Sequence, residues 1–280
     1  MKSIVRALLV LHPEERVREC LLRAAEARYH VRAVPTWEEL RSALREAPPS
    51  ALVVVDPYSG NGAGAPAPAL RGLLGEFPSS TVIAAMETAG PRYRDVHTLG
   101  HWGVVDVLSL NLELTPEAVR RRLQTMHGRA LQRLLQRALP PTLPSRAVSI
   151  VMTAAETVSS GGHAADVART LLVSGRTLNR WAVSAALPPP RRLLAWMRVL
   201  LAGALLDDPG RSVASVSQAC GYSSDSALRT ALNAFLGRSP KRLRQTGAFT
   251  FASEQFLADL ASRRRARAPR PRLPARYGEL

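Results

Sequence analysis

The sequence predicts a multidomain molecule: an α/β doubly wound domain on a five-stranded parallel sheet, followed by an all-α domain with two pairs of short helices. Three observations predict it. Five apolar runs of strand length alternate with helical patterns before residue 126. After the prolines at 140–144, every periodic segment has helical spacing. The chain of 280 residues is also long enough for two domains of roughly 100–200 residues each.

The first half is expected to form the parallel sheet. Its apolar runs are continuous, as in strands that helices cover on both faces. Right-handed crossovers would then gather the loops at the carboxyl ends of the strands. Thr36 and Glu39 have capping-box spacing at the start of one helix. The expected strands are 3–11, 29–34, 51–55, 81–86 and 103–108, and the expected helices are 13–29, 36–47, 68–77, 92–100 and one that starts at 115.

This half resembles the receiver domain of bacterial response regulators, because it has five such units and Asp56 ends the third strand. The resemblance implies Asp56 as phosphoacceptor. It also requires an acidic pair near Leu11 and His12, a Thr or Ser at Met86, and a Lys near Leu110. Those side chains are missing, and a single carboxylate is a poor cage for Mg²⁺. We therefore expect a degenerate receiver-like domain, a pseudo-receiver, and keep phosphorylation of Asp56 as the alternative.

A helical pattern continues from Pro116 to Leu139. Its apolar stripe either forms a seam between two chains or packs on its own domain, and the spacing allows both. A homodimer is therefore one expectation. The stripe contains Val119, Leu123, Met126, Ala130, Leu134 and Ala138.

The charge is distributed unevenly. The net charge is +16, with 15 basic and 14 acidic residues in 1–125 but 23 and 8 in 126–280. A basic half indicates a polyanionic partner, with nucleic acid ahead of an acidic membrane. The sequence contains no apolar run of the roughly 18 residues that span a bilayer and no signal peptide, so we expect no membrane partner. Two distant cysteines, Cys20 and Cys220, favour a cytoplasmic protein with reduced thiols.

No constellation predicts an enzyme, a metal site or a cofactor. His97 and His101 are four residues apart without Glu or Cys companions, and no GxSxG motif occurs. The Gly-rich loop at 60–69 lacks the Lys-Ser/Thr of a phosphate-binding loop.

The second half is predicted to contain two helix-turn-helix units. In each, a short helix, a tight turn and a second helix with a polar outer face follow one another. Ser174 is placed to cap the second helix of the first unit. In the second unit Gly221 permits the turn and Ser223 is placed as the cap. The expected helices are 145–160, 164–173, 174–186, 191–206, 212–220 and 223–235.

Residues 145–246 resemble the DNA-binding domain of the AraC/XylS transcription regulators. Ala182, Leu228 and Leu232 stand where the family usually carries Phe, so the core is expected to have less bulk. The signature residues present are Arg198, Ala202, Leu206, Val216, Ala219, Cys220, Gly221, Tyr222, Ser223, Gly237, Ser239, Pro240 and Arg244.

The resemblance implies which residues face DNA. Arg pairs with guanine, Asn with adenine, and Ser or Thr with base edges or phosphates. The two second helices are expected in successive major grooves about 34 Å apart. The implied positions are Gly175, Arg176, Asn179 and Arg180 in the first unit, and Asp225, Ser226, Arg229, Thr230 and Asn233 in the second.

These patterns together predict a bacterial, cytoplasmic, sequence-specific transcription regulator that binds double-stranded DNA and contacts RNA polymerase. The alternatives are a phosphorylated response regulator and an adaptor that does not bind DNA. The basic run at 263–272 indicates a disordered tail. The expected organisation is 1–126 receiver-like domain, 127–144 helical and Pro-rich linker, 145–248 double helix-turn-helix domain, and 249–280 basic tail.

Overall fold

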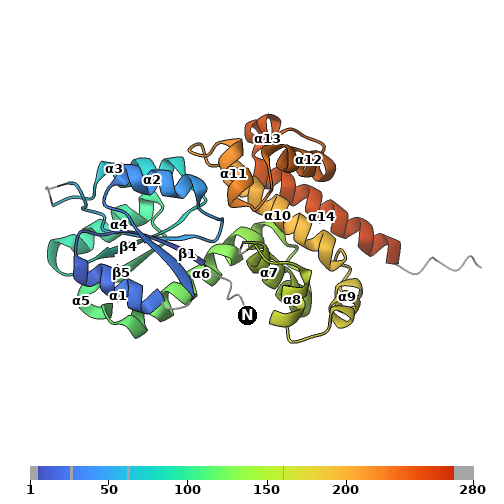
Figure 1. Ribbon diagram of the computed structural model, residues 1–280, viewed down its shortest axis with the longest axis horizontal. Helices are drawn as coiled ribbons and strands as arrows, with labels where there is room; N and C mark the ends of the chain where they lie inside the picture. The colour runs from blue at the N-terminus through green and yellow to red at the C-terminus, as the bar shows by residue number, and fades with distance from the viewer. Residues whose placement is uncertain (1–5, 26–27, 62–63, 160, 268–280) are drawn as a thin grey trace, which may run out of the picture.

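The computed structural model describes residues 6–25, 28–61, 64–159 and 161–267, except for the side chains of 127–134, 137 and 267. An α/β domain lies beside a helical domain in this structure (Figure 1). No helix among these residues is long and apolar enough to cross a membrane.

The N-terminal sheet has five parallel strands in the order β2-β1-β3-β4-β5. This order reverses between β1 and β3, as in doubly wound flavodoxin-like folds. Every residue of β3 and β4 is buried, which explains their continuous apolar runs. The predicted fold class is thus confirmed. The strands are β1 Arg6–Leu11, β2 Tyr29–Ala33, β3 Leu52–Val55, β4 Thr81–Met86 and β5 Asp106–Ser109.

Helices cover both faces of this sheet. Alternate strand residues point to opposite faces, so Val53 and Val54 lie in different cores. Thr36 caps its helix and accepts the backbone N–H of Glu39 at 3.2 Å. The last strand begins at Asp106, three residues later than predicted. One face carries α1 Glu15–Ala25 and α6 Pro116–Ala138; the other carries α2 Trp37–Glu46, α3 Pro68–Glu76 and α4 Tyr93–Trp102. The turns η1 Gly90–Arg92 and α5 Leu110–Glu113 were not predicted.

Helix α6 belongs to both domains. Val119, Leu123 and Met126 pack in the sheet core, whereas Leu135 and Ala138 lie in the core of the helical domain. These residues are at most 2 % exposed. The stripe therefore packs within its own chain, and the interchain seam offered as an alternative is wrong for these positions. The side chains of Ala130 and Leu134 lie outside those that the structure describes.

The helical domain surrounds α10, which is buried along most of its length. Figure 1 shows α7 and α14 beside it, and both α9 and α12 contact it. The helices are α7 Ser145–Ser159, α8 Ala164–Thr170, α9 Gly175–Ser184, α10 Pro190–Leu206, α11 Val213–Ala219, α12 Asp225–Leu236, α13 Pro240–Thr246 and α14 Ala248–Arg267.

Helix α14 corrects the prediction of a disordered tail from residue 249. Phe256 is fully buried, and its ring centroid lies 5.4 Å from that of Trp196. The carboxylate of Asp207 accepts the backbone N–H groups of Ala248 and Phe249 at 2.6 and 3.0 Å, which satisfies the start of the helix. Burial of one apolar face thus orders this segment despite its arginines. The remainder of the predicted tail, 268–280, lies outside the described residues.

A loop between α10 and α11 docks the two domains together. Asp208 and Arg211 are 0 % and 4 % exposed and form an ion pair with an N···O distance of 3.1 Å. One guanidinium nitrogen of Arg211 donates to the backbone carbonyls of Arg45 and Ala47, both at 3.0 Å. Residues 208–211, which we call the docking loop, therefore place a charged side chain against the end of α2.

The docking loop also contacts the segment between α3 and β4. Asp208 accepts the backbone N–H and the hydroxyl of Ser79, at 2.9 and 2.6 Å. The backbone N–H of Gly210 donates to the carbonyl of Glu76 at 2.9 Å. A Cβ at Gly210 would lie 2.6 Å from the ring of Phe77, so only glycine fits here without rearrangement. A second contact between the domains is the ion pair of Arg6 with Glu156.

Candidate nucleic-acid interface

The first helix-turn-helix unit consists of α8 and α9. The chain turns at Leu172, whose φ of 55° lies in the left-handed region. Ser174 is the N-cap of α9, and its hydroxyl accepts the backbone N–H of Thr177 at 3.1 Å. Leu178 and Ala182 are buried at 1 % and 0 % exposure, which fixes the rotation of α9 about its axis.

The second unit consists of α11 and α12. Its turn is at Gly221, with φ of 68°. The predicted cap, Ser223, is wrong by one residue. Helix α12 begins at Asp225, and the hydroxyl of Ser224 accepts the backbone N–H of Ala227 at 3.1 Å. The cap follows the left-handed residue by two positions in the first unit and by three in the second, an offset that sequence spacing does not reveal.

An aromatic cluster from three helices includes Phe235 of α12, the helix in which Leu228 and Leu232 stand where the family usually carries Phe. Leu228 and Leu232 are fully buried. Trp196 of α10 packs its ring edge-on to Phe235 of α12, with centroids 4.8 Å apart, and also contacts Phe256 of α14. The second unit thus keeps a well-filled core, to which the unpredicted helix α14 contributes.

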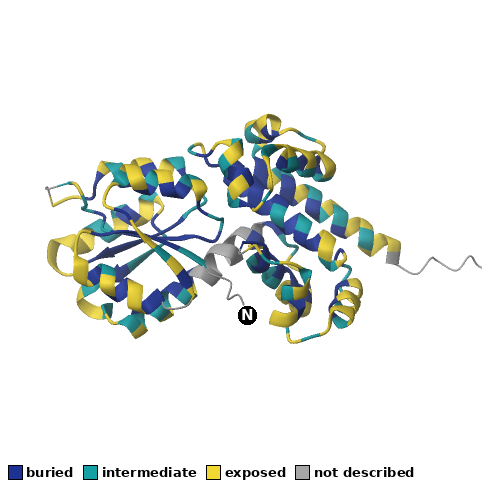
Figure 2. Ribbon diagram, viewed as in Figure 1, coloured by how far each residue is buried: buried dark blue, intermediate teal, exposed yellow. Residues whose placement is uncertain are grey.

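The outer faces of α9 and α12 are exposed (Figure 2). Within each helix the implied DNA-facing side chains are spaced by three or four residues, so they share one face. In the described part of the chain, none of these side chains forms a hydrogen bond or ion pair. They are Arg176, Asn179 and Arg180 on α9, and Asp225, Ser226, Arg229, Thr230 and Asn233 on α12, of which Asp225 alone is partly buried.

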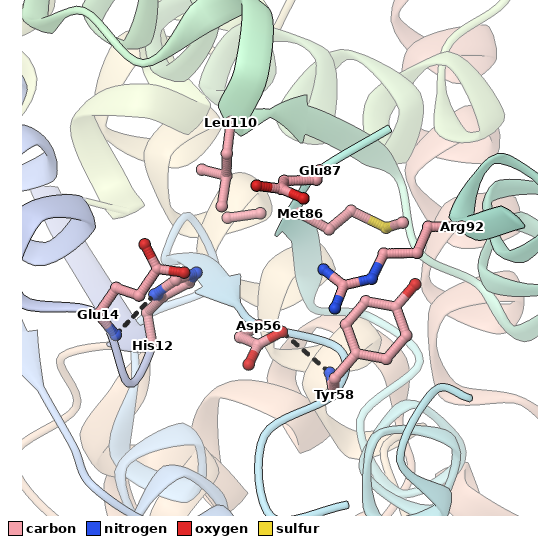
Figure 3. Close-up of a pocket in the computed structure, with 9 residues that line it drawn as sticks. His12, Glu14, Asp56, Tyr58, Met86, Glu87, Arg92 and Leu110 are labelled. Carbon is pink, nitrogen blue, oxygen red and sulfur yellow. Dashed lines mark hydrogen bonds between the residues drawn. The ribbon is translucent and has the colours of Figure 1, made fainter. Parts of the chain in front are cut away.

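A polar cavity of about 280 Å³ lies at the carboxyl ends of the strands in the N-terminal domain. Figure 3 shows Asp56 at its base, where one carboxylate oxygen accepts the backbone N–H of Tyr58 at 3.0 Å. Asp56 thus follows β3 and lines this cavity, where the resemblance to receiver domains implies a phosphoacceptor. The cavity is lined by His12, Glu14, Asp56, Tyr58, Ala85, Met86, Glu87, Arg92 and Leu110.

His12 occupies the position where a receiver carries an acidic residue. It is 5 % exposed, and burial lowers the pKa of its imidazole below the ordinary value. Its Nδ1 accepts the backbone N–H of Glu14 at 3.2 Å. An imidazole whose Nδ1 is engaged by the backbone is a poor ligand for Mg²⁺, which prefers oxygen.

The cavity is also lined by the carboxylates of Glu14 and Glu87, but among the described residues these do not come together with Asp56 as a metal-binding group. Met86 and Leu110 line it where the family has a hydroxyl and an amine. Arg92 stacks on the ring of Tyr58, with 4.7 Å from its guanidinium carbon to the ring centroid. Tyr58 donates its hydroxyl to Asp95 at 2.8 Å, and burial together with this bond raises the pKa of the phenol. No group of three His, Cys, Asp or Glu in the described ranges is arranged to hold a metal ion, so the residues present do not fit the Mg²⁺ of a receiver.

Comparisons with known proteins agree with the helical domain. A family model described as a helix-turn-helix domain matches residues 167–246. A search of curated proteins found no match. Among solved structures, full-length FixJ from B. japonicum is similar at a TM-score of 0.33 and 15 % identity, covering 81 % of this chain and 95 % of that one. Families of the matched type are transcription regulators and not enzymes. Residues 167–246 are therefore a helix-turn-helix domain of the AraC type, which follows an α/β domain with a five-stranded parallel sheet.

Proposed function

We propose that this protein is a sequence-specific transcription regulator in which α9 and α12 read two major grooves of double-stranded DNA. The observation that carries the proposal is the pair of exposed polar helix faces, whose arginines have no acidic partner among the described residues. Unpaired Arg and Asn side chains on such a face are suited to the acceptor and donor pattern of base edges. The adaptor alternative would predict apolar or acidic outer faces instead.

The individual contacts follow from side-chain chemistry. Arg180 and Arg229 are suited to the bidentate pairing with O6 and N7 of guanine, and Asn179 and Asn233 to adenine. Each good bidentate contact gives about 1–3 kcal/mol of discrimination against a wrong base. Backbone N–H groups at the starts of the helices would hold phosphates and fix the register.

Selection of bound DNA from a random pool tests this proposal. We expect one enriched sequence with two conserved blocks about one helical turn apart. Arg180→Ala and Arg229→Ala should each relax the preference in one block. Arg94→Ala, an exposed arginine of the other domain, is the matched control and should leave both blocks unchanged. If no sequence is enriched, the adaptor reading replaces this one.

We further propose that the receiver-like domain acts without conventional phosphorylation of Asp56. The engaged, neutral His12 and the apolar Met86 and Leu110 support this, because an aspartyl phosphate needs cations to neutralise its developing charge. Incubation with acetyl phosphate and Mg²⁺ should leave the wild-type protein unlabelled. Labelling that disappears in Asp56→Asn would establish the phosphorylated response regulator instead.

Contacts with RNA polymerase, self-association and a cytoplasmic location remain part of the proposal. Self-association cannot use the apolar stripe of α6, which is buried within the chain, so a homodimer would have to form through another surface.

A further inference from the structure

A second cavity, of about 390 Å³, lies between the start of α8 and the first half of α10. Its lining consists of His163, Ala164, Arg191, Leu194 and Arg198. Arg191 and Arg198 are seven residues apart, two turns of α10, so they project from the same side of the helix. Leu194 lies between them and is 6 % exposed, which gives the two guanidinium groups an apolar neighbour.

Neither arginine has a hydrogen-bond or ion-pair partner among the residues that the structure describes. Partly buried arginines elsewhere in the chain do: Arg41 pairs with Glu76 and Arg122 with Glu113. A charge that is partly withdrawn from water is costly unless an opposite charge or a hydrogen bond compensates it. This cost falls on Arg198, which is partly buried, whereas Arg191 is exposed; an anion in the cavity would compensate the charge of Arg198 and lie within reach of Arg191.

The acid of α8 among the described residues, Asp166, is already engaged and does not supply that charge. Asp166 of α8 accepts the backbone N–H of His163 at 2.8 Å and pairs with Arg169 at 2.6 Å. These contacts hold Asp166 in the capping box of α8.

We propose that this cavity is an oxyanion site that binds a phosphate group through Arg191 and Arg198. Guanidinium groups match phosphate oxygens with two parallel N–H···O bonds, which makes arginine the usual ligand for planar oxyanion recognition. The imidazole of His163 adds a further nitrogen to the lining. The phosphate comes either from the DNA backbone, in which case the site rests on the proposed function, or from a free anion.

The position of the cavity connects the two helix-turn-helix units. His163 and Ala164 begin the first unit. Arg198 lies close enough to Cys220 and Tyr222 of the second unit for its charge to oppose the rise in their pKa that burial causes. A phosphate in this cavity would thus be held at the junction of the units, on the helix that sets their separation.

Titration with inorganic phosphate, followed by calorimetry, tests the site without DNA. We expect wild type and Arg94→Gln to bind alike, and Arg191→Gln and Arg198→Gln to bind about tenfold more weakly or worse. Arg191 is exposed, so its substitution leaves the fold intact. Arg198→Lys keeps the charge and should restore part of the affinity. Equal phosphate binding by all variants would mean an adventitious ion only.

Single methylphosphonate substitutions along the selected DNA site identify the source of the phosphate. If the DNA supplies it, one neutralised position weakens the wild type but not Arg198→Gln, and this variant lowers the salt dependence of DNA binding by about one unit. If a free anion supplies it, only the phosphate titration distinguishes the variants. Failure of both experiments overturns the site. If the wild-type protein binds no DNA at all, the proposed function is overturned instead, and the phosphate titration alone decides whether the oxyanion site exists.

Discussion

Removal of the carboxylate of Asp208 should separate the two domains. In Asp208→Ala the guanidinium of Arg211, whose side chain is 2 % exposed, loses its ion partner, and Ser79 loses its acceptor. Breaking a buried pair from one side costs about 3–5 kcal/mol. Arg211 keeps the carbonyls of Arg45 and Ala47, so we expect the lower end, about 3 kcal/mol.

Thermal and urea unfolding measure this cost. For a chain of this size, about 3 kcal/mol corresponds to a fall in Tm of roughly 6–12 °C. We also expect one cooperative transition in the wild type to become two, because the docking loop joins the domains. Glu38→Ala removes an exposed partner of Arg41 and is the control, with an expected change of about 0–1 kcal/mol.

The double variant Asp208→Ala/Ser79→Ala sharpens the test. Since both residues belong to one hydrogen-bond network, their effects should not add, with a coupling of about 0.5–3 kcal/mol. If Asp208→Ala costs no more than Glu38→Ala, or its effect adds simply to that of Ser79→Ala, the buried contact between the domains does not form and the reasoning fails.

Three further predictions concern single residues. Leu172→Gly should raise the free energy of unfolding by about 0.5–1 kcal/mol in urea melts, because Leu172 has a positive φ that glycine adopts without strain. Gly221→Ala should lower the free energy of unfolding for the same reason. Changes of the opposite sign in both variants would refute the turn geometry. Phe256→Ala should cost about 3–5 kcal/mol in the same assay, whereas no loss would mean that α14 is not part of the core. Burial lowers the pKa of His12, so as the pH falls the unfolded chain takes up a proton on this imidazole before the folded chain does. The neutral imidazole therefore contributes to folding stability above pH 6.5, and this contribution is lost as the pH falls towards the pKa of the folded state. His12→Gln should therefore flatten the acid side of the stability profile, and an unchanged profile would exclude His12 as its cause.

Much of the N-terminal fold could be predicted from the sequence because parallel strands leave a strong signal. The run that ends in Met86 is buried at every position, and its predicted bounds match the strand. The fifth strand was predicted to begin at Gly103, but Gly103 ends α4 with a φ of 111°. The next two residues lead the chain back to the sheet, and β5 begins at Asp106.

Helix α14 was missed because the sequence was interpreted from its charge and not from its apolar spacing. Phe249, Ala252, Phe256 and Leu260 recur at spacings of three and four, which is a helical signal. The arginines that follow led to the prediction of a tail instead. The docking loop, by contrast, gives no local signal: Asp208 lies in a turn-like DDPG run after the end of α10, and its partner Ser79 lies 129 residues earlier.

The shared helix α6 restricts how this protein can be cut or recombined. A helical domain expressed from residue 145 would lack Leu135 and Ala138 and expose the surface that they cover. A chimaera with another input domain has to be joined inside α6 in the correct helical phase. Each residue inserted or deleted there turns the DNA-reading half by about 100° and moves it by about 1.5 Å, so most splice points would misdirect it. The two halves are thus exchangeable parts only at junctions that preserve this phase.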